Sequence, residues 1–203
     1  MNKSRLSALA LALALSAVSA FSCSEKTAVL DGEKNTSVSD TTDPANKYSG
    51  NSKKTNSAFG QEMEVNNTVF TLNDVVRVSA PNVENSDFVF INVTIKNKTD
   101  IEYEINSMNN FFVALPNETE ISMDVRANLY AIQNYPKCIQ DNITIPANGE
   151  FTGFLAGGFL VPAGTDSLTV GFFPTLNNEK DASNVILSPV NAENISTDDS
   201  KLK

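Results

Sequence analysis

The stretch DFVFINVTIKN, residues 87–97, decides the fold because apolar β-branched side chains recur at every second position along it. A period of two is the pattern of a β-strand that buries one face, since successive side chains point to opposite sides of a sheet. Turn-forming residues enclose the stretch at 81–86 and at 97–100. We therefore predict a central sandwich strand whose buried face carries Val89, Ile91, Val93 and Ile95.

Similar short apolar runs lie on both sides of this strand, with turn signals such as Asn66-Asn67 between them. Seven to nine short strands separated by turns predict an all-β fold, an immunoglobulin-like antiparallel β-sandwich. The buried Trp and the cysteine pair of true immunoglobulin domains are absent from the sequence, so the term describes architecture alone. We expect strands within residues 62–65, 68–72, 75–78, 101–105, 111–115, 121–125, 143–145, 151–161 and 167–173, and an edge strand at 185–187.

The N-terminus has the pattern of an export signal. Lys3 and Arg5 precede an apolar run at residues 6–18, which is too short to remain as a membrane-spanning helix. Cys23 follows Ser22 at the end of this segment, which resembles a bacterial lipobox, so we predict a signal peptide at 1–22 and lipid attachment at Cys23. Cleavage after Ala20 is the competing interpretation, and it would give a freely secreted protein.

Composition divides the rest of the chain into three parts. Residues 23–60 comprise the lipidated cysteine and a polar stretch with few apolar residues, which predicts a disordered tether. Residues 61–191 are the predicted β-sandwich, and 192–203 are a predicted disordered tail. The segment 126–141 has a poor strand pattern and is expected to be a loop with a helical turn at 127–132.

Charge and residue content restrict the chemistry. The predicted sandwich has six basic and sixteen acidic residues, a balance that repels nucleic acid. The chain contains no histidine, which excludes Ser-His and Cys-His catalysis and every histidine-containing metal site. Cys138, the second of the two cysteines, lacks a base and is predicted to be an inert thiol. We expect no enzyme activity and no cofactor; a small hydrolase with a carboxylate pair is the weakest alternative.

Two polar loops contain the oxygen ligands that calcium prefers, although no EF-hand pattern is present. A calcium-dependent adhesion module is therefore an alternative, and polar loop residues solvated by water are the simpler one. The candidate ligands are Asn82, Glu84, Asn85 and Asp87 in one loop, and Asn117, Glu118 and Glu120 in the other.

Several phenylalanines cannot all face one core, because adjacent residues of a strand point to opposite sides. The pairs are Phe111-Phe112 and Phe172-Phe173, and Phe88 and Phe90 share one strand face. Either the 126–141 segment covers the outward rings, or they form an exposed apolar patch of the kind that marks a partner surface.

Five motifs carry a family resemblance: GQEMEV (60–65), FVFINVTIKN (88–97), IPANGE (145–150), FLVP (159–162) and SLTVGF (167–172). Together they resemble the telokin-like, immunoglobulin-like domain of unknown function found on many Gram-positive lipoproteins, which is related in fold to a secreted mycobacterial immunoprotective antigen. The resemblance covers about residues 60–190 and implies a cell-envelope domain without catalytic residues. The segment 121–141 departs from the shorter connection usual in that family.

These observations predict an exported bacterial protein that Cys23 anchors to the extracellular face of the cell membrane. Its sandwich is expected to have a binding or structural role, with no catalysis. The expected partners are the membrane, through the lipid, and a protein or cell-wall component; we expect a monomer. The alternative is a freely secreted antigen or inhibitor-like binding protein.

Overall fold

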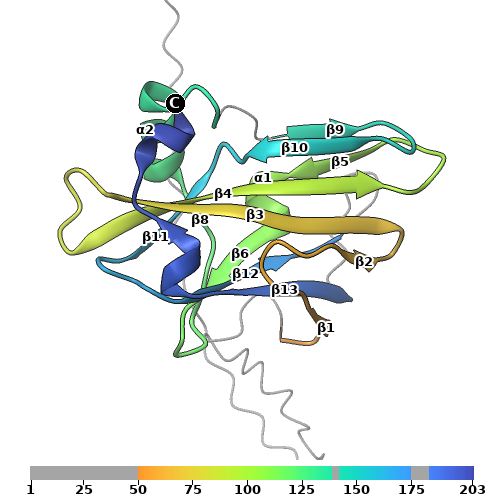
Figure 1. The fold of residues 1–203 in the computed structure, drawn as a ribbon, viewed down its shortest axis with the longest axis horizontal. Coiled ribbons are helices and arrows are strands. Elements are labelled where there is room, and N and C mark those ends of the chain that lie inside the picture. Colours follow the sequence, from red (N-terminus) through yellow and green to blue (C-terminus); the bar gives the residue numbers. More distant parts are fainter. Residues whose placement is uncertain (1–49, 139–141, 175–182) are drawn as a thin grey trace, which may run out of the picture. The chain divides into compact units, whose positions relative to one another are not determined.

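A computed structural model describes residues 50–138, 142–174 and 183–203 of the chain. The predicted signal peptide, Cys23 and residues 24–49 of the predicted tether lie outside the described residues. Figure 1 shows the arrangement of the strands and helices. Within the described part, no helix is long and apolar enough to cross a membrane.

The described residues form two main β-sheets and a two-stranded one, which confirms the predicted β-sandwich. The seven-stranded sheet has the order β14 (Ile195–Ser196), β3 (Thr68–Ser79), β4 (Ser86–Asn97), β11 (Gly158–Pro162) and β8 (Met123–Asp124), with β2 (Met63–Val65) beside β3 and β10 (Glu150–Phe154) beside β4. The five-stranded sheet has the order β1 (Lys53–Asn56), β13 (Asn184–Val190), β12 (Leu168–Phe172), β6 (Phe111–Ala114) and β7 (Glu120–Ile121). The two-stranded sheet pairs β5 (Tyr103–Asn106) with β9 (Asn142–Ile145).

In the part of the chain that the structure describes, four helical segments join or cover these sheets. They are α1 (Ser107–Asn110), α2 (Val125–Asn134), and the 3-10 turns η2 (Ala192–Asn194) and η3 (Asp199–Leu202). Helix α2 lies in the segment predicted as a loop with a helical turn, and it is longer than that turn. It begins where the Asp124 carboxylate accepts a hydrogen bond from the backbone N–H of Arg126 at 2.7 Å, an N-cap that the sequence provides.

Strand β4 is central, as its alternation predicts. It pairs with β3 along one side, from Asn97 opposite Thr68 to Asp87 opposite Ser79, and with β11 and β10 along the other. Its four aliphatic residues are fully buried between the sheets. Strand β3 is one continuous strand rather than the predicted two, because an irregularity at Asn73 accommodates one extra residue without ending the ladder.

The outer face of β4 is buried at its first half, and α2 is the element that covers it. The ring of Phe88 lies 5.6 Å from that of Tyr130, and the ring of Phe90 lies 5.6 Å from that of Tyr135, measured between centroids. Coverage of Phe88 and Phe90 by the 126–141 segment is therefore confirmed.

The two adjacent phenylalanine pairs each divide between two faces of the five-stranded sheet. Phe111 and Phe172 stack on each other in the core between the sheets, with centroids 4.9 Å apart. Phe112 and Phe173 form a separate buried cluster that includes Val185. The predicted alternation is correct, and both faces are buried.

The boundary predicted between tether and sandwich at residue 61 is wrong. Strand β1 pairs in parallel with β13, from Lys53 opposite Asn184 onward, and Phe59 packs on the core. Consequently β13 lies between β12 and β1 and is not the predicted edge strand. The composition of β1 did not reveal it, because backbone hydrogen bonds rather than apolar side chains attach a polar edge strand.

The predicted disordered tail at 192–203 is also wrong. Strand β14 pairs in parallel with β3, and the side chain of Leu202 is fully buried in the cluster beneath α2. Ile195, which packs on the core, and Leu202 are isolated large apolar residues in a polar segment, and isolated residues of this kind give little sequence signal. The predicted strand at 121–125 is divided as well, since β7 joins one sheet, β8 joins the other, and Val125 begins α2.

Candidate functional site

Among the candidate calcium ligands, Asp87 and Asn117 have side chains that are engaged by other groups of the domain. The Oδ2 atom of Asp87 accepts a hydrogen bond from the backbone N–H of Gly164 at 2.8 Å and lies 3.4 Å from Nε of Arg77. Asn82, Asn85 and Glu118 have left-handed backbone angles, while Asn117 accepts a bond from the backbone of Thr119 and Glu120 lies in β7. Glu84 belongs to the same β3–β4 turn as Asn82 and Asn85. No three His, Cys, Asp or Glu side chains in the described ranges are grouped to hold a metal ion.

Cys138 lies in the cluster beneath α2 and is fully buried. Burial raises the pKa of its thiol to about 12, although the neighbouring Lys137 charge acts in the opposite direction. The reactive thiolate is therefore scarce at neutral pH, in agreement with the predicted inert thiol.

A depression lies beside β10, and we call it the β10 groove. It has a volume of about 470 Å³. One wall is β10 itself, and the other is formed where the end of α2 meets η3, at the upper side of the view in Figure 1. Its lining residues are Asn92, Pro136, Lys137, Phe151, Thr152, Gly153, Phe154 and Lys201.

Strand β10 has one edge paired and one edge open. The backbone N–H of Leu155 donates to the carbonyl of Ile91 at 3.1 Å, and that of Asn97 donates to the carbonyl of Gly149 at 2.9 Å. Alternation along an antiparallel ladder then directs the N–H and C=O groups of Thr152 and Phe154 away from β4. Within residues 50–138, 142–174 and 183–203, no strand pairs with that outer edge.

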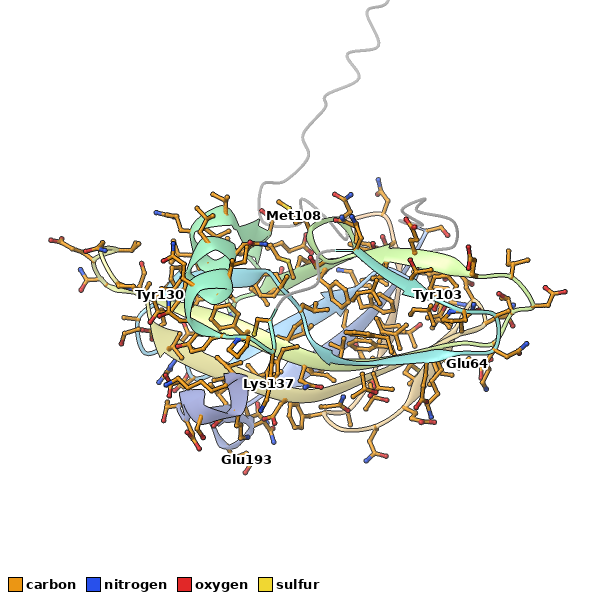
Figure 2. All side chains as sticks on the ribbon, turned by 90° about the horizontal axis from the view of Figure 1, so that it is seen from above. Glu64, Tyr103, Met108, Tyr130, Lys137 and Glu193 are labelled. Atoms are coloured by element: carbon orange, nitrogen blue, oxygen red, sulfur yellow. The ribbon has the colours of Figure 1, made fainter. Side chains whose placement is uncertain are left out.

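The opposite wall is fixed by contacts between the end of α2 and the C-terminal turn. The backbone N–H of Lys137 donates to the carbonyl of Leu202 at 3.4 Å, and Nζ of Lys137 donates to the carbonyl of Lys201 at 3.1 Å. The hydroxyl of Tyr135 lies 3.4 Å from the Asp199 carboxylate. Burial raises the pKa of Tyr135, and the neighbouring Tyr130 hydroxyl and Asp199 carboxylate raise it further, so the hydroxyl of Tyr135 keeps its proton. Figure 2 labels Lys137 in this wall.

The charge of the groove is opposite in sign to the net charge of the domain. Two lysines line it, and none of its described lining residues is acidic. Nζ of Lys201 lies 2.8 Å from the Asp74 carboxylate, whereas Lys137 forms no ion pair with any described carboxylate. The groove is therefore a local cationic site on an acidic protein.

Hydrogen bonds on the outer face of the sheet direct further donors toward the groove. Nδ2 of Asn73 donates to Oδ1 of Asn92 at 3.1 Å and to Oγ1 of Thr94 at 2.9 Å, and Thr94 and Thr152 share a bond of 2.8 Å. Either hydroxyl can be the donor in the bond between Thr94 and Thr152. Asn92 uses its Oδ1 atom as the acceptor for Asn73, so its amide N–H groups are left for a ligand.

A second exposed feature is the outer stripe of α2. Val125, Leu129 and Ile132 are spaced i, i+4 and i+7 and have 63%, 55% and 59% of their surface exposed. A depression of about 300 Å³ separates this helix from the β3–β4 turn and includes Val83 and Phe88. This stripe is apolar and without directed polar groups, so it provides no chemical selectivity.

Sequence reasoning did not identify the β10 groove. Lys137, Thr152 and Lys201 come from three distant segments, and none of them belongs to a motif. At Gly153, a Cβ atom would lie 3.1 Å from Cζ of Phe151, so this position in the groove leaves little room for a side chain.

Comparisons with known proteins place this architecture in a family. No curated protein matches the sequence. Similar solved structures include a candidate lipoprotein, ycdA, from Bacillus subtilis, with 16% identity, a TM-score of 0.48, and coverage of 70% of this chain and 40% of that one. The chain thus spans well under half of the ycdA chain. The yjhA protein from Bacillus subtilis has 15% identity and a TM-score of 0.47 over 64% of this chain and 97% of its own.

The secreted protein MPT63 from Mycobacterium tuberculosis is also similar, with 13% identity and a TM-score of 0.45 over 67% of this chain and 97% of its own. Residues 57–183 match the model of a family described as a domain of unknown function, DUF4352. This range runs from the end of β1 to the start of β13 and contains both β4 and β10, which confirms the family resemblance seen in the motifs. The chain belongs to the DUF4352 family.

Proposed function

We propose that this protein is an exported, lipid-anchored binding protein of the bacterial cell surface, without catalytic activity. The observation that supports a binding role is the β10 groove, with two lysines, an open strand edge and no acidic side chain among its described lining residues. The sequence of the first 23 residues supports export and the anchor at Cys23. Two acyl chains anchor a protein stably, whereas one does so only marginally.

The anchor positions the groove near the cell surface. Residues 24–52 connect Cys23 to β1, so the anchor would keep the domain within the length of this segment from the membrane. The anchor then keeps the domain within reach of the expected partner, a protein or cell-wall component. A calcium-dependent adhesion module receives less support, because Asp87 is already engaged by Arg77 and Gly164.

Metabolic labelling with an alkyne fatty acid tests the anchor. We expect label on the wild-type protein and on Cys138→Ala, and none on Cys23→Ala. Cys138→Ala is the matched control because it removes the only other cysteine. An unlabelled protein whose N-terminus is Phe21 would contradict the anchor and select the freely secreted alternative.

Site-specific photo-crosslinking on intact cells tests the binding role. A photoreactive residue at Thr152 is expected to give adducts that decrease with Lys137→Glu, since both residues line the groove. The control places the same residue at Ala163, an exposed position after β11 that does not line the groove. Equal adducts from both positions would contradict a ligand site in the groove.

A further inference from the structure

We propose that the β10 groove binds an extended acidic peptide segment, which adds to the seven-stranded sheet as a strand paired with β10. This inference rests on the proposed binding function and names the partner class. It follows from three features of the described residues: the hydrogen-bonding groups of the open edge, the shape of the groove, and the charge of its wall.

The open edge of β10 offers both donors and acceptors. Thr152 and Phe154 each direct one N–H and one C=O group outward, at positions two residues apart. A partner that satisfies all four groups must itself alternate N–H and C=O with a repeat of about 6.8 Å, which is the repeat of an extended peptide. A small anion would leave the two carbonyl groups without donors. The edge therefore favours a peptide strand.

The groove follows this edge and has different surfaces on its two sides. Thr152 and Phe154 point to the outer face, where Asn92 and Thr94 lie opposite them on β4, and Phe151 points to the inner face. Side chains of an added strand alternate in the same way. Every second peptide side chain would therefore meet Lys137 and Lys201, and the others would lie on the side of Phe151.

Charge selects an acidic segment. Lys137 has no carboxylate partner in the described part of the chain, and the amide N–H groups of Asn92 also suit a carboxylate. Elsewhere the domain is acidic and would attract a basic peptide without selectivity. Preference for acidic residues would thus be specific to the groove.

The lysines also have a simpler explanation. Natural proteins use lysine beside an exposed strand edge to prevent pairing with other chains. The two explanations predict opposite outcomes, because a protected edge binds no peptide, whereas a receptor edge retains peptides of a defined composition.

The test uses a phage-displayed library of random ten-residue peptides and the mature chain with Cys23→Ala, immobilised in its folded form. We expect the retained peptides to be enriched in Asp and Glu. The Lys137→Gln, Lys201→Gln double variant should lose that enrichment. Absence of retained peptides, or retention without acidic enrichment, would overturn the proposal.

Two variants at one position test strand pairing. Thr152→Pro removes an N–H that points away from β4, so the existing ladder stays intact and an edge proline is tolerated. Thr152→Val keeps the N–H and removes the hydroxyl. Thr152→Pro removes one backbone hydrogen bond to the peptide and disturbs the register of strand pairing, so the affinity of a retained peptide should fall about tenfold or more. In Thr152→Val the affinity should fall only a few-fold. Equal affinities in the two variants would refute strand pairing.

Amide hydrogen exchange of the unsubstituted chain gives a measurement that does not depend on a proline variant folding. A synthetic copy of a retained peptide should slow exchange at the amides of Thr152 and Phe154, and unchanged exchange there would refute the pairing. Failure of the proposed function has a different signature: no lipid on Cys23, or no groove-dependent adduct at position 152. Adducts combined with unchanged exchange would refute only the strand mode.

Discussion

Replacement of Ser188 by alanine should stabilise the protein. Ser188 lies in β13 opposite Val170 and is fully buried, with the core residues Ile186 and Val190 on the same face of the strand. Its hydroxyl has no hydrogen-bond partner among the residues that the structure describes. A hydroxyl buried in this way lowers stability because it loses its bonds to water on folding.

The magnitude follows from the environment of that hydroxyl. An unsatisfied buried polar group costs about 1–3 kcal/mol, and removal of the oxygen returns part of this but leaves a small void. We therefore expect Ser188→Ala to raise the free energy of unfolding by about 1 kcal/mol. For a domain of this size that corresponds to a rise in Tm of about 2–4 °C.

Urea and thermal unfolding of Ser188→Ala measure this effect, with Ser57→Ala as the matched control. Ser57 is also buried, but its hydroxyl donates to the carbonyl of Gln61 at 3.1 Å. Its replacement should therefore lower the free energy of unfolding by about 1 kcal/mol. A loss of stability in both variants would show that Ser188 has a hydrogen-bond partner in solution, and the reasoning would be refuted.

Three further substitutions test other parts of the fold. Leu202→Ala removes a fully buried side chain from the cluster beneath α2 and should lower stability by about 2–4 kcal/mol in urea unfolding, whereas Lys203→Ala should have no measurable effect. Gly171→Ala would place a Cβ atom within the ring of Phe112, so we expect a loss of more than about 2 kcal/mol; an unchanged Tm would contradict that contact. Burial raises the pKa of Cys138 to about 12 from 9.0, so the unfolded state loses the thiol proton first, and stability should fall between about pH 9 and 12. The free energy of unfolding of Cys138→Ala should fall less over the same pH range. Equal slopes of unfolding free energy against pH in the two proteins would refute the burial effect.

The sequence predicted the parts of the fold that side-chain alternation encodes. The aliphatic period of β4 identified a strand buried on one face, and the phenylalanine pairs indicated rings on both faces of a strand, although the sequence did not decide whether the outward rings are covered. Both ends of the domain were missed for the same reason. Strand β1 is polar and β14 has only two residues, and the ladder that attaches each of them consists of backbone groups that are identical in every sequence.

The candidate site was beyond sequence reasoning for a different reason. Lys137 and Lys201 are separated by 64 positions along the chain, and their proximity depends on the contact between the end of α2 and η3. That contact depends in turn on Leu202, whose burial composition alone did not indicate. The calcium hypothesis relied instead on residues that are close in sequence, but Asp87 is engaged by Arg77 and Gly164, and Asn117 accepts a bond from the backbone of Thr119.

The open edge of β10 exists because β9 does not pair with it. The turn at Pro146–Gly149 would suit a simple hairpin between these two strands, yet β9 pairs with β5 instead. The buried amide of Asn97 explains this choice, since its Nδ2 donates to the carbonyls of Ile101 at 2.6 Å and of Pro146 at 3.0 Å. These bonds hold the chain before β5 against the chain after β9, which brings β5 and β9 together. One buried polar side chain thus keeps β9 from pairing with β10. The edge of β10 that is left open lies beside the two lysines.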